Sequence, residues 1–154
     1  MAGAAPKIQI DSSGLAVTIL VTSWHAEVTD ALLAGAERAL KESGNDLYTI
    51  IRVPGAFELP LAAKWAAEDE ADAIIALGVV IQGETPHFEY VCDAATQGLN
   101  RVQLDYGIPV GFGLLTVDNL QQAIDRAGLS GSKEDKGAEA VEAAIHMARL
   151  RTID

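Results

Sequence analysis

The sequence predicts an α/β domain with a four-stranded parallel sheet covered by helices on both faces. Apolar runs alternate along the chain with segments whose apolar residues recur every three or four positions, which gives the order β-α-β-α-β-α-β-α. The runs are apolar throughout rather than at every second residue, which is typical of parallel strands buried on both faces. Neighbouring strands of such a sheet should be joined by right-handed crossovers.

Residues 1–14 are predicted to form an N-terminal arm, and residues 15–154 a single domain. Within the arm, residues 7–10 alternate polar and apolar side chains and are a candidate strand at a sheet edge. Residues 15–21 form the first buried strand. The helix that follows has an apolar stripe starting at Val28 and ends at Ser43-Gly44.

Residues 47–53 form the second predicted strand, and the Pro54-Gly55 loop connects it to an alanine-rich helix that opens at Ala56. Glu58 has two interpretations. An acidic residue is favourable in the first turn of a helix. Its carboxylate also lies where it can accept a hydrogen bond from a ligand at the carboxyl edge of the sheet.

Residues 73–106 are the segment around which the rest of the chain is organised. A dense apolar strand over residues 73–81 breaks at Gln82-Gly83-Glu84. A helix then starts, with Thr85 as its predicted N-cap and Pro86 at its first position. Open α/β sheets bind ligands at such strand-to-helix turns. The unpaired amides and the helix dipole there suit an anion such as phosphate.

His87 is expected at about the second position of that helix. The helix dipole disfavours the charged imidazole, so we expect a largely neutral side chain near pH 7. A neutral imidazole beside an anion site can exchange protons with a reacting molecule. The alternative is a surface histidine at a helix end.

Two aromatic residues are candidate walls of a ligand pocket. Trp24 follows the first strand and offers a flat face for a heterocycle, although a partly buried packing role is equally compatible with its position. His25 beside it is a cap or a solvated residue. Phe112 lies between two glycines in the fourth apolar run, residues 108–115, and is either a core residue or a second aromatic wall.

Two cations flank the last loop of the chain. Arg126 lies in a short helix over residues 119–127, and Lys136 opens the final helix over residues 136–150. Such charges are often simply solvated, but in a chain of net charge −11 they are a possible clamp for an anion.

Composition excludes several classes of function. A net charge of −11 argues against nucleic acid or an anionic membrane as the main partner, and no run of about 18 apolar residues is present. The single Cys92 cannot form a disulfide within the chain, and residues 1–6 lack a signal-peptide pattern, so a cytoplasmic location is expected. The three histidines are far apart, and no metal site is expected.

Four segments together resemble the 6,7-dimethyl-8-ribityllumazine synthase family. They are VPGAFELP (residues 53–60), GVVIQGETPHFEY (78–90), QAIDRAG (122–128) and EDKG (134–137). The resemblance implies a flavodoxin-like three-layer domain that assembles as a pentamer, or a larger shell of pentamers, with active sites between subunits. It also implies condensation of 5-amino-6-(D-ribitylamino)uracil with 3,4-dihydroxy-2-butanone 4-phosphate, the penultimate step of riboflavin synthesis, without cofactor or metal.

The resemblance also implies a role for individual residues. His87 matches the proton donor and acceptor, and Arg126 and Lys136 match basic residues at the phosphate. The other matching positions are Trp24 for stacking on the pyrimidine, Ala56, Phe57 and Glu58 for the ribityl chain, Val79, Val80 and Ile81 for the uracil, Glu84 and Thr85 for the phosphate turn, and Phe112 for a wall from the adjacent subunit.

Three features depart from the family pattern. Gln82 stands where many members have arginine, and Glu84 places a carboxylate beside the phosphate turn, so we expect its side chain to point outward. The loop over residues 129–135 lacks the form typical of shell-forming members, which favours an isolated pentamer or a decamer. Other readings remain: a riboflavin synthase of the same fold, a carrier that binds flavin or lumazine, or a structural cage protein.

Overall fold

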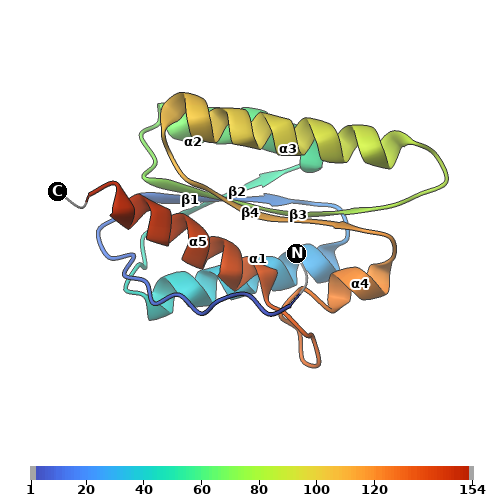
Figure 1. The fold of residues 1–154 in the computed structure, drawn as a ribbon, viewed down its shortest axis with the longest axis horizontal. Helices are drawn as coiled ribbons and strands as arrows, with labels where there is room; N and C mark the ends of the chain where they lie inside the picture. Colours follow the sequence, from blue (N-terminus) through green and yellow to red (C-terminus); the bar gives the residue numbers. More distant parts are fainter. Residues whose placement is uncertain (1–2, 153–154) are drawn as a thin grey trace.

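A computed structural model of the chain, which describes residues 3–152, has the predicted three-layer α/β/α architecture. Its four parallel strands lie in the order β2-β1-β3-β4. Helices α1, α4 and α5 cover one face of the sheet, and α2 and α3 cover the other (Figure 1). The bounds are β1 Val17–Thr22, α1 Ala26–Glu42, β2 Thr49–Val53, a 3-10 turn η1 Ala56–Glu58, α2 Leu59–Glu68, β3 Ala73–Ile81, α3 His87–Tyr106, β4 Val110–Val117, α4 Leu120–Ile124 and α5 Lys136–Leu150.

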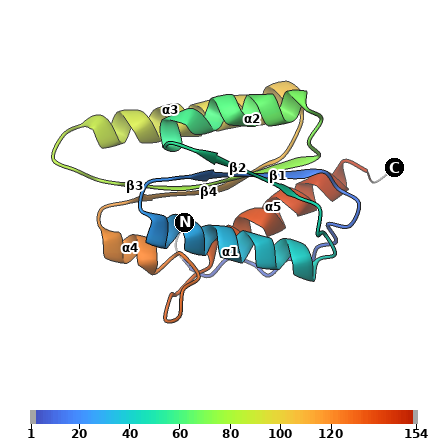
Figure 2. The same cartoon turned by 180° about the vertical axis from the view of Figure 1, so that it is seen from behind.

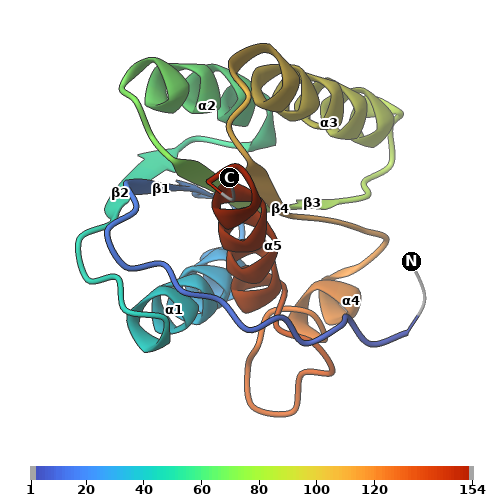
Figure 3. The ribbon, with the colours of Figure 1, turned by 60° about the vertical axis from the view of Figure 1, so that its left-hand side comes forward.

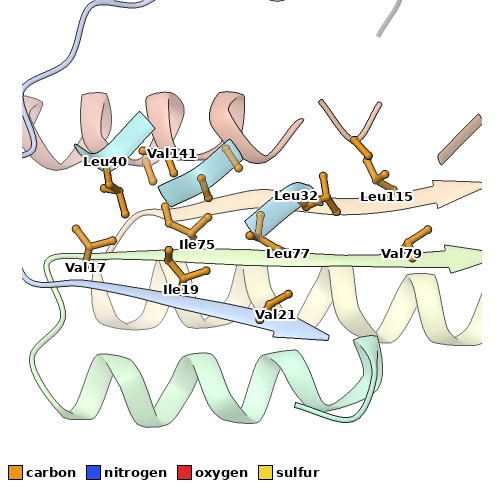
Figure 4. Close-up of a cluster of buried hydrophobic side chains, with 14 of the residues drawn as sticks. Val17, Ile19, Val21, Leu32, Leu40, Ile75, Leu77, Val79, Leu115 and Val141 are labelled. Carbon is orange, nitrogen blue, oxygen red and sulfur yellow. The ribbon is translucent and has the colours of Figure 1, made fainter. Parts of the chain in front are cut away.

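The two faces of the sheet bury separate clusters of apolar side chains. Ile19 of β1 and Ile75 of β3 face α1 and α5, where both are fully buried (Figure 4). Their neighbours in sequence, Leu20 and Ile74, face α2 and α3 and are also fully buried. Burial on both faces explains why these strands are continuous apolar runs rather than alternating ones.

Glycines let the helices approach each other closely. A Cβ atom at Gly137 of α5 would overlap the carbonyl oxygen of Leu32 in α1. A Cβ at Gly98 of α3 would lie 2.6 Å from the ring of Pro60 at the start of α2. Seen from behind, α2 and α3 run side by side, and α3 starts further beyond the carboxyl edge of the sheet (Figure 2).

The sheet opens between β1 and β3 at its carboxyl edge. Pairing between these strands ends at Val21 and Leu77, whereas β3 pairs with β4 as far as Ile81 and Val117. β1 is connected to β2 through α1 on one face, and β2 to β3 through α2 on the other. This is the topological switch point of the sheet, where parallel α/β folds bind ligands.

The N-terminal arm does not add a strand to the sheet of its own protomer. Residues 4–12 have no strand structure and cross the layer formed by α1 and α5 (Figure 3). Arg149 of α5 holds the arm by donating to the carbonyl oxygens of Asp11 at 2.8 Å and Ser13 at 2.6 Å. The alternating residues 7–10 form no strand in this protomer, and the arm is held through the carbonyl groups of Asp11 and Ser13.

Candidate functional site

The turns after β1 and β2 are tied together at the carboxyl edge. The Ser23 backbone N–H donates to the carbonyl oxygen of Pro54 at 3.3 Å, and its hydroxyl donates to that of Val53 at 2.9 Å. These bonds hold Trp24, which follows Ser23, against the backbone of the second turn.

Trp24, Gly55 and Glu58 form one side of the site. A Cβ atom at Gly55 would lie 3.3 Å from Cδ1 and 3.4 Å from Nε1 of Trp24, so the indole ring lies along the glycine backbone. The Gly55 N–H donates to Oε2 of Glu58 at 2.9 Å, which caps the 3-10 turn. Trp24 is 67% exposed, so its ring remains available for stacking on a flat ligand.

The end of β3 supplies main chain more than side chains to this site. Val79 is buried in the cluster that faces α1 and α5, so its side chain points towards that face of the sheet (Figure 4). Val80 packs against the opposite cluster, and Ile81 is half-buried. Because β1 no longer pairs with β3 beyond Leu77, the main-chain edge of β3 faces the opening. Its N–H and C=O groups are strong hydrogen-bonding groups.

The start of α3 differs by one residue from the prediction. The helix begins at His87, Pro86 takes the cap position, and no side chain caps the helix, so the predicted Thr85 N-cap is wrong. Pro86 has φ −68° and ψ 2°, and its carbonyl accepts from Glu89 N–H at 3.1 Å, which is a tight first turn rather than a regular capped one. Glu84, Thr85 and His87 are all exposed.

The first turns of α3 extend away from their own protomer. Gly98 meets Pro60 at the start of α2, and it lies eleven residues after His87, or about 16 Å along the helix. The first fully buried residue of α3 is Ala95, whereas Tyr90 is 73% exposed. The His87 end of α3 is therefore a surface that another molecule is able to cover.

Arg126 and Lys136 lie together, but neither is a free-standing charge. The Lys136 N–H donates to the carbonyl oxygen of Arg126 at 3.0 Å across a short antiparallel bridge. Glu134 lies between the two side chains, 3.7 Å from Arg126 Nε and 3.5 Å from Lys136 Nζ. Glu139 accepts a hydrogen bond from Lys136 at 2.6 Å and, with Glu134, raises the pKa of Lys136.

These cations line an open cavity of about 440 Å³. The acidic groups beside them were not predicted from the sequence. Glu134 and Glu139 were missed because their spacing from Lys136 becomes meaningful only once the loop folds back on α5. The cavity also contains Lys133 and the backbone of Gly3 and Ala4. A bound anion there has to compete with carboxylates already present.

The predicted site residues fall into three groups in one protomer. Trp24, residues 56–58 and the end of β3 gather at the carboxyl edge, with the start of α3 on the same face. The cations lie at the same edge but on the other face, next to α4 and the start of α5 (Figure 1).

Phe112 lies apart from both groups. It pairs with Ala76, five residues before the end of β4, or about 17 Å from the carboxyl edge. Its ring is 48% exposed and lines a second cavity of about 290 Å³ against the middle of α3. The cavity that Phe112 lines does not include His87 of the same protomer.

Two kinds of feature are absent from residues 3–152. No group of three His, Cys, Asp or Glu side chains is arranged to hold a metal ion there. In the same span, no helix is both long and apolar enough to cross a membrane.

Comparison with known proteins gives a consistent result along the chain. The family model described as 6,7-dimethyl-8-ribityllumazine synthase matches residues 14–152. A protein of Kineococcus radiotolerans with that name is 62% identical over 92% of this chain and 88% of its own length. A protein of the same name from Clavibacter michiganensis is 60% identical over 92% of this chain and 88% of its own length. Another from Renibacterium salmoninarum is 56% identical over 96% of both chains.

Proposed function

The chain belongs to the 6,7-dimethyl-8-ribityllumazine synthase family, and from this premise we propose how its own residues carry out the reaction. It is a transferase of riboflavin biosynthesis that condenses 5-amino-6-(D-ribitylamino)uracil with 3,4-dihydroxy-2-butanone 4-phosphate, releasing phosphate and water. The observation that carries our assignment of the site is the exposed Trp24 ring lying along Gly55 beside Glu58, at the switch point of the sheet.

The pyrimidine substrate binds at the opening between β1 and β3. Its ring stacks on Trp24, which is held in place by the neighbouring turn. Its carbonyl and N–H groups pair with the main-chain edge of β3 at residues 79–81, where no strand is paired on that side. The ribityl hydroxyls are held by Ala56, Phe57 and the exposed carboxylate of Glu58.

His87 moves protons while the two substrates condense. The 5-amino group attacks the ketone to form an imine with loss of water, phosphate leaves, and the second amine closes the ring with loss of another water. A histidine that exchanges these protons contributes about 10²–10⁴-fold to the rate. Holding the two substrates side by side contributes as much or more. His87 lies at the start of α3, directly after the turn through Glu84 and Thr85 whose backbone faces the phosphate.

The phosphate cations and the second aromatic wall come from a neighbouring protomer. In one protomer the cations lie on the face of the sheet opposite α3, and Phe112 lies about 17 Å from the carboxyl edge. The extended start of α3 and its exposed Tyr90 provide a surface for a second copy. Contacts between two different surfaces of one chain form a ring when the rotation between neighbours closes, and we assign this assembly to a closed pentamer.

The same arrangement explains why a chain of net charge −11 can use a phosphorylated substrate. Arg126 and Lys136 bring two cations to one cavity, and the phosphate binds them by displacing Glu134. We also assign residues 15–154 to one cytoplasmic domain with an N-terminal arm, and we expect the arm to reach the exposed edge strand β2 of a neighbour.

Turnover of both substrates tests this function directly. Purified protein is mixed with the two substrates, and the lumazine product is followed by its absorbance and fluorescence, with each substrate omitted in turn as the control. Product formation only with both substrates is expected. Tight riboflavin binding without turnover would support a carrier instead. Light scattering distinguishes a pentamer from a larger shell.

A further inference from the structure

Thr22, the last residue of β1, has a buried hydroxyl group without a partner. Its side chain is 1% exposed, and its Oγ1 is the buried side-chain atom in residues 3–152 that makes no hydrogen bond. Buried hydroxyls in folded proteins are nearly always hydrogen-bonded, because leaving one unpaired costs stability. An exception therefore calls for a partner outside the chain, either an ordered water or a ligand.

The position of Thr22 indicates which partner this is. Thr22 lies one residue beyond the last pair between β1 and β3, at the base of the opening in the sheet. Its side chain lies against Gly78 of β3, where a Cβ atom would come within 2.7 Å of the Thr22 hydroxyl oxygen. The absence of a side chain at Gly78 therefore makes room for this hydroxyl at the switch point.

The adjacent serine provides a contrast. The Ser23 hydroxyl and backbone N–H both bond to the turn after β2, so they have a structural role. Thr22 shares its face of the sheet with Leu20, and this face is covered by η1 and α3, which also carry Glu58 and His87. Its hydroxyl is thus on the substrate side of the sheet but takes no part in holding the turns together.

We propose that Thr22 is a further substrate-binding residue, whose hydroxyl bonds the polar edge of the pyrimidine ring when that ring enters the opening between β1 and β3. A hydroxyl both donates and accepts, so it can pair with either a ring carbonyl or a ring N–H. The inference rests on the proposed function, since it names a contact of the same site. Thr22 adds a side-chain contact to the main-chain edge of β3.

The test separates binding from stability with two substitutions at Thr22. Thr22→Val removes the hydroxyl and keeps the shape, so the free protein should gain about 2–4 °C in Tm. Its Kd for 6-(D-ribitylamino)uracil, which lacks the 5-amino group that forms the imine, should rise about 3- to 10-fold by calorimetry. Thr22→Ser keeps the hydroxyl, so it should bind within about twofold of wild type while losing Tm through the lost methyl group.

Thr18→Val is the matched control, because Thr18 lies on the same strand and the same face but about 13 Å from Thr22. It should leave the Kd unchanged. Thr22→Val binding within twofold of wild type would overturn the proposal. The proposal is also overturned if Thr22→Val and Thr22→Ser weaken binding of the analogue equally and both lower the Tm, because that result indicates a structural role. If the wild type binds the analogue but makes no lumazine, the proposed function fails while the Thr22 comparison still gives an answer.

Discussion

Arg126→Ala should specifically impair use of the phosphorylated substrate. The guanidinium is oriented by a 2.8 Å hydrogen bond to the carbonyl oxygen of Gln122 and lies 3.7 Å from Glu134. A charge-assisted hydrogen bond contributes about 1.5–3 kcal/mol, which corresponds to a loss of about 10- to 150-fold in kcat/KM. Because Glu134 already pairs with Arg126 in the free protein, part of that gain is offset. We therefore expect about 10- to 30-fold.

The assay varies the butanone phosphate at saturating pyrimidine and records lumazine fluorescence. The loss should appear in kcat/KM for the phosphorylated substrate, whereas the Kd of 6-(D-ribitylamino)uracil should stay the same. Arg101→Ala is the matched control, because Arg101 pairs with Asp105 at 3.2 Å, is 83% exposed and lines neither of the two cavities described above. It should change kcat/KM less than twofold, because exposed ion pairs contribute little energy. If Arg126→Ala leaves both kcat and KM for the phosphate substrate unaltered, Arg126 does not bind phosphate.

Three further predictions concern catalysis and stability. His87→Ala should lower kcat by about 10²-fold or more in the same assay while the pyrimidine Kd holds, and an unchanged kcat would exclude proton transfer by His87. Gly137→Ala should lower the free energy of unfolding by about 1–3 kcal/mol, because the added Cβ overlaps the Leu32 carbonyl oxygen. Urea titration measures this loss, and wild-type stability would refute the contact. Burial, followed by two nearby carboxylates, raises the pKa of Glu142. A carboxyl group whose pKa is raised on folding supports the fold below its unfolded pKa and loses that effect as pH rises through the folded pKa. Glu142→Gln should thus raise Tm at pH 7.5, and the gain should shrink towards pH 4; a gain that is equal at both pH values would contradict it.

The layers of the fold could be predicted because burial dictates the sequence of each strand. β3 is buried on both faces, and its nine residues are apolar or glycine. Element ends were less predictable, since capping depends on geometry at single residues. The first turn at Pro86 is tight, so the helix begins at His87 without a side-chain cap. The arm's alternating residues 7–10 resemble a strand but form none in this protomer, where Arg149 of α5 binds the carbonyl groups of Asp11 and Ser13.

The part of the candidate site that lies at the ends of the strands could be predicted from the sequence. The part that forms where distant segments meet was less predictable. Trp24 and Glu58 were expected at the same edge from strand order alone, and they do flank Gly55. The acidic partners of Lys136 were missed, because their contact requires the loop to fold back on α5. The Thr22 hydroxyl was also missed, since an unpaired group is recognisable only when its surroundings are known.

Mixing two impaired variants tests most directly whether the site is shared between protomers. His87→Ala and Arg126→Ala chains, carrying different affinity tags, are co-expressed, and oligomers containing both are isolated. In a mixed ring at equal ratio, about one quarter of the sites combine an intact His87 with an intact Arg126 from the neighbour. We predict recovery of about one quarter of the wild-type kcat/KM for the phosphorylated substrate. Activity no greater than the sum of the separate variants would contradict a shared site.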